Sequence, residues 1–104
     1  MRTLPVLTAL LGAAAISAAQ LPARAKDLVC VGVSAQVIYR AYGYDHIVHL
    51  VNHCDGDAAC DVSTDVNPEV THVLVPVNTS VDVLTFRGSP ARVFTPRVSC
   101  RSAH

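Results

Sequence analysis

The chain has 104 residues, and its eight basic and eight acidic side chains balance when histidine is neutral. This length suits one small domain. The four arginines near the carboxyl end are too few, and too diluted by acidic residues elsewhere, to predict a nucleic-acid partner.

The first 25 residues have the pattern of a secretory signal peptide. Arg2 gives a positive start, an uncharged apolar run follows from about Leu4 to Ala19, and Ala23-Arg24-Ala25 has the small residues of a cleavage site. A retained anchor is the alternative, but the run is shorter than the about 20 residues of a typical membrane span. We therefore predict a signal peptide over 1–25 and a secreted or periplasmic domain over 26–104, with no membrane attachment after cleavage.

The four cysteines of the mature chain are expected to form two disulfides, because a core this small is marginal and the compartment is oxidising. Loop-closure entropy separates the three pairings by less than about 1 kcal/mol. Cys54 and Cys60 flank a turn-rich stretch that predicts a hairpin, whereas Cys30 and Cys100 lie near the two ends of the domain. We therefore favour the pairs Cys54–Cys60 and Cys30–Cys100. Metal binding by these cysteines is the alternative, but their spacing matches no common zinc pattern.

The mature sequence is rich in valine and poor in helix-forming residues, which favours strands. Turn signals such as Asp55-Gly56-Asp57, Asn67-Pro68 and Gly88-Ser89-Pro90 separate several of the expected strands. The fold class that follows is all-β, a small disulfide-stapled antiparallel β-sandwich or partly open barrel. Residues 33–42 could instead form a bulged strand or a short helix. The expected strands are 28–33, 35–42, 44–52, 60–64, 72–75, 81–86 and 92–101.

Histidines and acidic residues raise the question of a metal site. On a strand His46 faces away from His49 and His53, so a site would need His49 or His53 together with His72 from a neighbouring strand. The acidic stretch from Asp55 to Asp65 lacks the regular spacing of an EF-hand. We predict no metal and no cofactor, and leave the histidine site as an alternative.

The segment from Arg87 to Arg97 is the most distinctive local run. A loop that presents arginine and phenylalanine would suit a protein interface. The candidate contact surface is therefore Arg87, Arg92, Phe94 and Arg97. The alternative is a turn at Gly88-Ser89-Pro90, followed by an edge strand that tolerates Pro96.

The size, the two expected disulfides and the all-β pattern resemble the secreted bacterial α-amylase inhibitors of the tendamistat type. The similarity extends loosely over the stretch from Val75-Pro76 through Ala91-Arg92 to Cys100-Arg101. It implies a similar architecture and carries over no functional residue, because the inhibitory Trp-Arg-Tyr triplet is missing from a chain without tryptophan. A Gly88-Ser89-Pro90-Ala91-Arg92 run is also similar to that of small secreted bacterial proteins and implies no activity.

No serine lies in a nucleophile motif, and oxidised cysteines cannot act as nucleophiles, so we expect no catalytic residue. The expected function is a non-catalytic binding or interaction module for an extracellular or periplasmic protein. An inhibitor of an extracellular enzyme and a histidine-based metal-binding protein are the alternatives. The sequence does not predict the oligomeric state.

Overall fold

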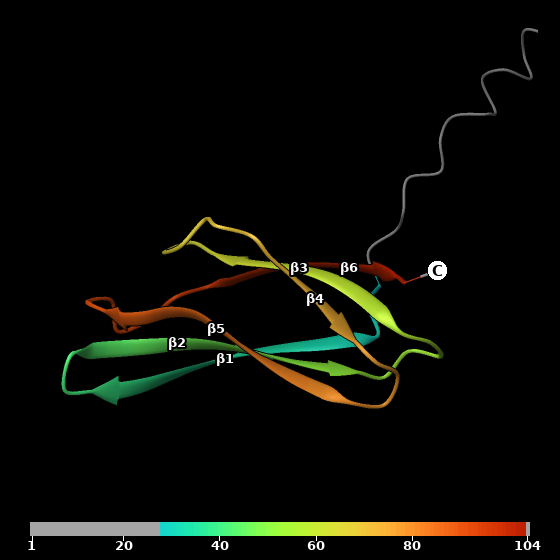
Figure 1. Cartoon of the computed structure of the whole chain (residues 1–104), viewed down its shortest axis with the longest axis horizontal. Coiled ribbons are helices and arrows are strands. Elements are labelled where there is room, and N and C mark those ends of the chain that lie inside the picture. Colours follow the sequence, from blue (N-terminus) through green and yellow to red (C-terminus); the bar gives the residue numbers. More distant parts are fainter. Residues whose placement is uncertain (1–27, 104) are drawn as a thin grey trace, which may run out of the picture.

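The computed structural model describes residues 28–103, so the predicted signal peptide lies outside the described residues. Six strands form two three-stranded antiparallel sheets, which lie one above the other (Figure 1). Sheet A has the order β1-β2-β5 and sheet B the order β4-β3-β6. The strands are β1 (Val31–Arg40), β2 (Gly43–Asn52), β3 (Ala58–Thr64), β4 (Thr71–Val75), β5 (Ser80–Ser89) and β6 (Pro96–Ser102).

Alternating side chains of the two central strands build the core. Every second residue of β2 from His46 to Asn52 is buried, and so is every second residue of β3 from Ala58 to Thr64. A strand with this period of two places one set of side chains on each face, so these buried rows face the opposite sheet. The prediction of an all-β fold with antiparallel sheets and two disulfides is confirmed.

Two predicted elements differ from the structure. Residues 31–40 form one continuous strand in regular register with β2, so the two strands expected over 28–33 and 35–42 are one, without the bulge or short helix considered for residues 33–42. The last strand begins at Pro96 and not at residue 92, because residues 90–95 carry the chain from sheet A to sheet B. Within residues 28–103 no helix has the length and apolarity needed to cross a bilayer.

The predicted disulfide pairing was wrong: the structure joins Cys30 to Cys54 and Cys60 to Cys100. The expected hairpin between Cys54 and Cys60 does not form, because this connection leaves sheet A and enters sheet B. Cys30 precedes β1 and Cys54 follows β2, so antiparallel pairing of β1 with β2 brings the two together. Cys60 on β3 lies directly opposite Cys100 on β6.

The buried side chain of Asn52 fixes the connection between the sheets. Its Nδ2 donates to the carbonyl oxygens of Gly56 (3.0 Å) and Val75 (2.9 Å), and its Oδ1 accepts from the backbone N–H of Cys54 (2.7 Å). Asn52 therefore satisfies polar backbone groups at the end of sheet A, in the connection and at the end of β4. A buried amide in such a network stabilises one path of the chain over others.

The two disulfides are expected to contribute unequally to stability. From the entropy of loop closure in the unfolded chain, the Cys30–Cys54 disulfide should stabilise the fold by about 3.5 kcal/mol and the Cys60–Cys100 disulfide by about 3.9 kcal/mol. Cys60 and Cys100 are also both buried in the core, so their replacement leaves a cavity. In urea unfolding, Cys60→Ala/Cys100→Ala should lower the free energy of unfolding by about 1 kcal/mol more than Cys30→Ala/Cys54→Ala. Equal losses would show that the buried pair packs no better than the pair at the end of the domain.

Candidate functional site

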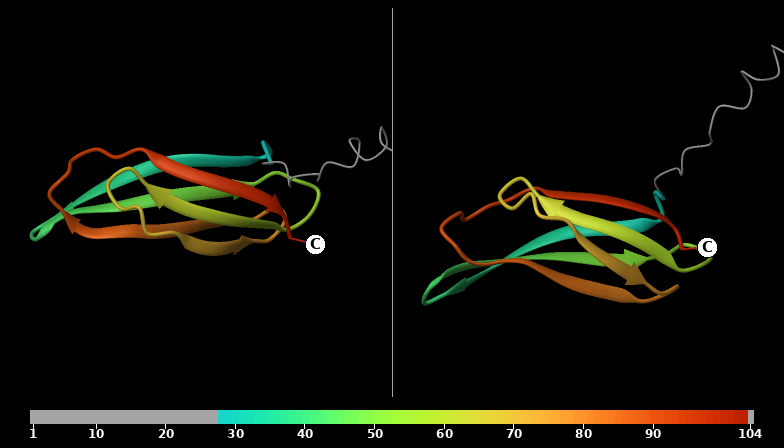
Figure 2. Two further views of the ribbon diagram at one scale, coloured as in Figure 1. Left: turned by 90° about the horizontal axis from the view of Figure 1, so that it is seen from above. Right: turned by 45° about the horizontal axis from the view of Figure 1, so that its top comes forward.

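All three tyrosines of the chain gather at one end of sheet A. They flank the turn between β1 and β2, and the pairing of Tyr44 with Ser89 brings the end of β5 alongside. The loop after β5 returns over the same end (Figure 2). We call this surface the Tyr/Arg end and define it as Tyr39, Arg40, Tyr42, Tyr44, Arg87 and Arg92.

The aromatic side chains of the Tyr/Arg end are both accessible and ordered by contacts. Tyr39 is 69% exposed and Tyr42 is 55% exposed. The rings of Tyr39 and Tyr44 lie 5.3 Å apart between centroids, and Arg92 Nε donates to the Tyr44 hydroxyl at 3.2 Å. Tyrosine and arginine are the residue types that most often carry the binding energy of protein interfaces.

The buried carboxylate of Asp45 holds the Tyr/Arg end together. It accepts hydrogen bonds from the Gly88 N–H (3.0 Å), from Arg40 Nε (3.2 Å) and from the Tyr42 hydroxyl (3.4 Å). Burial opposes ionisation, but the Gly88 hydrogen bond and the nearby Arg40 and Arg87 charges outweigh it and lower the pKa of Asp45 below 3.8. The ionised carboxylate thus ties the β1–β2 turn to β5.

Two glycines permit the close approach of these segments. A Cβ on Gly43 would lie 2.7 Å from the carbonyl carbon of Gly88, and a Cβ on Gly88 would lie 2.9 Å from Tyr42 Cδ1. Both glycines also have positive φ angles, 133° for Gly43 and 70° for Gly88. Only glycine fits these positions without strain, so the close approach of the β1–β2 turn to β5 depends on both glycines.

The structure divides the contact surface expected from the sequence. Arg87 and Arg92 belong to the Tyr/Arg end. Phe94 is only 9% exposed and stacks on His46, with 4.4 Å between ring centroids, so its expected place on an exposed surface was wrong. Arg97 lies opposite Ser63 on the outer face of sheet B, away from the other two arginines.

His46 explains why Phe94 turns inward. The imidazole is fully buried between Phe86 and Phe94, and its Nε2 lies 2.8 Å from the carbonyl oxygen of Ala91. A carbonyl only accepts hydrogen bonds, so Nε2 carries the proton and donates. This bond and the aromatic stack fasten the loop that carries Arg92 onto sheet A.

The remaining histidines lie on separate surfaces. His49 contacts Asp82 and Gln36 on the outer face of sheet A, whereas His72 contacts Asp61 on the outer face of sheet B. The predicted alternative was a site of His49 or His53 with His72. His49 and His72 do not meet, and His53 follows β2, where its backbone N–H donates to the Cys30 carbonyl oxygen. Between residues 28 and 103 the structure has no group of three or more histidine, cysteine or acidic side chains that could hold a metal ion.

Asp61 forms a small charged cluster of its own. Its carboxylate accepts hydrogen bonds from His72 Nδ1 (2.6 Å) and Arg101 Nη1 (3.3 Å). The hydrogen bond from His72 lowers the pKa of Asp61 against the opposing effect of burial, and the Arg101 charge adds to the lowering. Asp61 is thus engaged within sheet B and does not join the acidic stretch that was considered for calcium.

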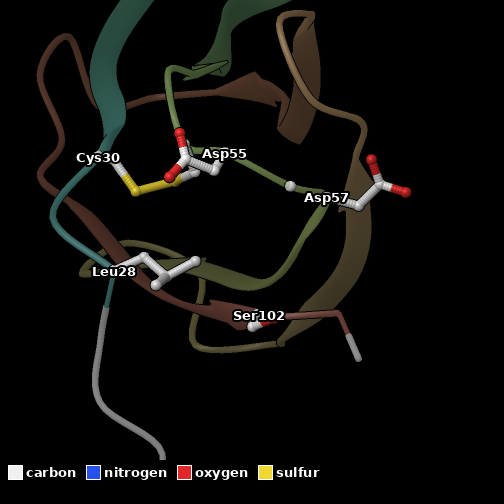
Figure 3. Close-up of a pocket in the computed structure, with 7 residues that line it drawn as sticks. Leu28, Cys30, Asp55, Asp57 and Ser102 are labelled. Carbon is white, nitrogen blue, oxygen red and sulfur yellow. A yellow bond between two sulfur atoms is a disulfide. The ribbon is translucent and has the colours of Figure 1, made fainter.

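A hollow of about 390 Å³ lies at the end of the molecule opposite the Tyr/Arg end (Figure 3). The Cys30–Cys54 disulfide and Leu28 form its apolar part. Asp55 and Asp57 are the carboxylates that line it, and Asp57 accepts a hydrogen bond from the Val77 N–H at 2.9 Å. Ser102, at the end of β6, also lines this open hollow.

Comparison with family models, curated proteins and solved structures yields no match for this chain. The sequence predicted Arg87 and Arg92 of the Tyr/Arg end but not its three tyrosines. The signal that could have found them was three tyrosines within six residues around a turn, at positions 39–44.

The carboxylate of Asp45 makes a pH-dependent prediction. Because its native pKa is lowered, ionised Asp45 stabilises the fold above pH 3.8, and this contribution is lost as the pH falls further. Asp45→Asn should lower the melting temperature by roughly 5 °C at neutral pH. The difference from the parent protein should shrink as the pH falls below 3.8. Asp55→Asn at the opposite end is the control and should melt like the parent protein. A constant difference between Asp45→Asn and the parent at all pH values would contradict the assignment.

Proposed function

We propose that the protein is a small, non-catalytic binding module that acts outside the cytoplasm and contacts a partner protein with its Tyr/Arg end. The observation that carries this proposal is the convergence of three tyrosines and three arginines from β1, β2, β5 and the following loop. In a small disulfide-stapled β-sandwich, the segments at one end of the sheets commonly carry recognition.

Pre-organisation supports the same surface. Binding costs conformational entropy wherever loose side chains and loops must become ordered. At the Tyr/Arg end, Asp45 fixes the turn, His46 fixes the loop and Arg92 is bonded to Tyr44. The surface can therefore contact a partner with little rearrangement.

Charge indicates the chemistry of the partner. Three of the five arginines between residues 28 and 103 lie at the Tyr/Arg end, where Asp45 is the one acidic residue. The other six acidic residues of this range lie elsewhere. The end is therefore positive and the remainder negative. Complementary charge steers association, so the partner should present an acidic surface.

The location follows from the covalent chemistry. Two disulfides in a domain of this size are typical of proteins that fold in an oxidising compartment. The signal-peptide pattern of residues 1–25 supports the same conclusion. A periplasmic or extracellular partner is thus the kind that this protein would meet.

Two matched double variants test the contact surface. Tyr42 is 55% exposed at the Tyr/Arg end and Leu74 is 56% exposed on sheet B, and both surfaces also carry an arginine. Tyr42→Ser/Arg92→Ala should weaken capture of a partner from culture medium or periplasmic extract by about tenfold or more. Leu74→Ser/Arg97→Ala should leave capture unchanged. Equal capture by the two variants would reject the Tyr/Arg end as the contact surface.

Inhibition of an extracellular enzyme is a second candidate for the same surface. The β1–β2 turn extends beyond the strands of sheet B (Figure 1), and such a rigid projection suits the cleft of an enzyme. Inhibition assays on secreted hydrolases, beginning with an α-amylase, test this candidate. Any inhibition should be lost in Tyr42→Ser and kept in Leu74→Ser, whereas inhibition that survives Tyr42→Ser would place the inhibitory surface elsewhere.

A further inference from the structure

Strand β1 is a long edge without a neighbour on one side. Its ten residues pair with β2 alone, and no strand within residues 28–103 pairs with its other side. The outer side of an edge strand presents backbone N–H and C=O groups that another strand can bind. Proteins therefore usually protect such edges with charges, prolines, bulges or short strands.

The other three edges of the molecule carry this protection. Strand β5 includes Asp82 and Arg87 and is paired with β2 through a register irregularity. Strand β4 has only five residues and is followed directly by Pro76. Strand β6 begins with a proline and contains two arginines. By contrast, β1 has neither charge nor proline from Val31 to Tyr39.

Apolar side chains on the core side of β1 are also poorly covered. Val33 lies opposite Leu50, which is fully buried, yet Val33 itself remains 44% exposed. Ala35 lies opposite the buried Val48 and is exposed as well. Val31 and Val37 of the same row pack on the core, so within this row sheet B leaves Val33 and Ala35 open. An additional strand beside β1 would cover them.

We propose that β1 is the interface of a homodimer, in which β1 of two copies pairs antiparallel about a two-fold axis at Ala35. The two copies of sheet A then form one continuous six-stranded sheet. This inference goes beyond the binding function of the Tyr/Arg end; the two surfaces meet at Tyr39, which lies opposite the second copy's Val31 in this register.

The sequence of β1 is complementary to itself in this register. On the core side, Val33 lies opposite the second copy's Val37, and Ala35 lies opposite its own equivalent. On the outer side, Ser34 lies opposite the second copy's Gln36, and Gly32 lies opposite its Ile38. Apolar cross-strand pairs stabilise a sheet and like charges directly opposite destabilise it. Since β1 has no charge between residues 31 and 39, no repulsion opposes the pairing.

This self-complementarity identifies the occupant as a second copy of the chain. A foreign strand would need an apolar row and a polar row that match those of β1, whereas every copy of the protein brings both. Pairing about a two-fold axis also stops at the dimer, because it uses up the one unprotected edge of each copy. The dimer would present its two Tyr/Arg ends in opposite directions.

Measurement of mass in solution tests the dimer. Sedimentation of the purified, disulfide-intact protein from about 1 to about 500 µM should show a transition from monomer to dimer. Val33→Lys and Leu84→Lys form a matched pair, because both side chains are 44% exposed on edge strands of sheet A. Val33→Lys should weaken dimerisation by about tenfold or more, and Leu84→Lys should leave it unchanged.

A second variant keeps the test decisive if Val33→Lys fails to fold. Ala35→Lys changes an exposed residue and would set two lysines opposite each other at the two-fold axis. A normal thermal melt and both disulfides confirm that a variant is folded. A monomer at all concentrations would overturn the proposal. Another part of the chain or a foreign strand would then have to cover β1. A dimer that survives both lysine substitutions would overturn the proposal as well.

Discussion

The side-chain amide of Asn52 determines where the chain goes at the end of β2, and the rest of the fold depends on that step. At the end of β2 the chain either turns back beside β2 or leaves for the second sheet. Asn52 is fully buried and bonds to Cys54, to Gly56 and to Val75 on β4, which links both sheets around one side chain. Without that amide three backbone groups would lose a partner, so departure to sheet B is the path that satisfies them. The disulfide pairs then follow, since Cys54 stays with sheet A and Cys60 enters sheet B.

This constraint explains what the sequence could and could not predict about the fold. Alternation of apolar and polar residues, as in β3, and richness in β-branched residues are local properties, so most strands and the all-β class were predictable. The pairing of the cysteines was not, because Asp55-Gly56-Asp57 has the composition of a hairpin turn and of a connection between sheets alike. The difference depends on where the Asn52 side chain finds its partners, and one of them, Val75, lies 23 residues away. Sequence patterns contain no signal for such a distant contact.

The candidate site was predictable to a similar degree and for a similar reason. Arg87 and Arg92 could be identified because they flank a turn of glycine, serine and proline. Phe94 was misassigned because its burial depends on His46, which is distant in the sequence and stacks on it from β2. The tyrosines lie close together in the sequence, but only the pairing of β2 with β5 brings them beside Arg87 and Arg92. The sequence therefore shows the separate segments of such a surface, but only the fold shows that they lie side by side.

The two proposed surfaces place different demands on the same strand. The end of β1 carries Tyr39 and Arg40, which belong to a rigid and charged surface, while residues 31–37 are uncharged and largely exposed. The positive Tyr/Arg end repels a basic surface, whereas the uncharged free edge of β1 repels no approaching strand by charge. A dimer formed along β1 would place its two Tyr/Arg ends at opposite ends of the shared sheet, with Tyr39 as the residue of each end that lies within the paired stretch. Two equivalent ends on one rigid sheet would also strengthen attachment to a partner that presents repeated acidic sites, because the second contact forms within the complex.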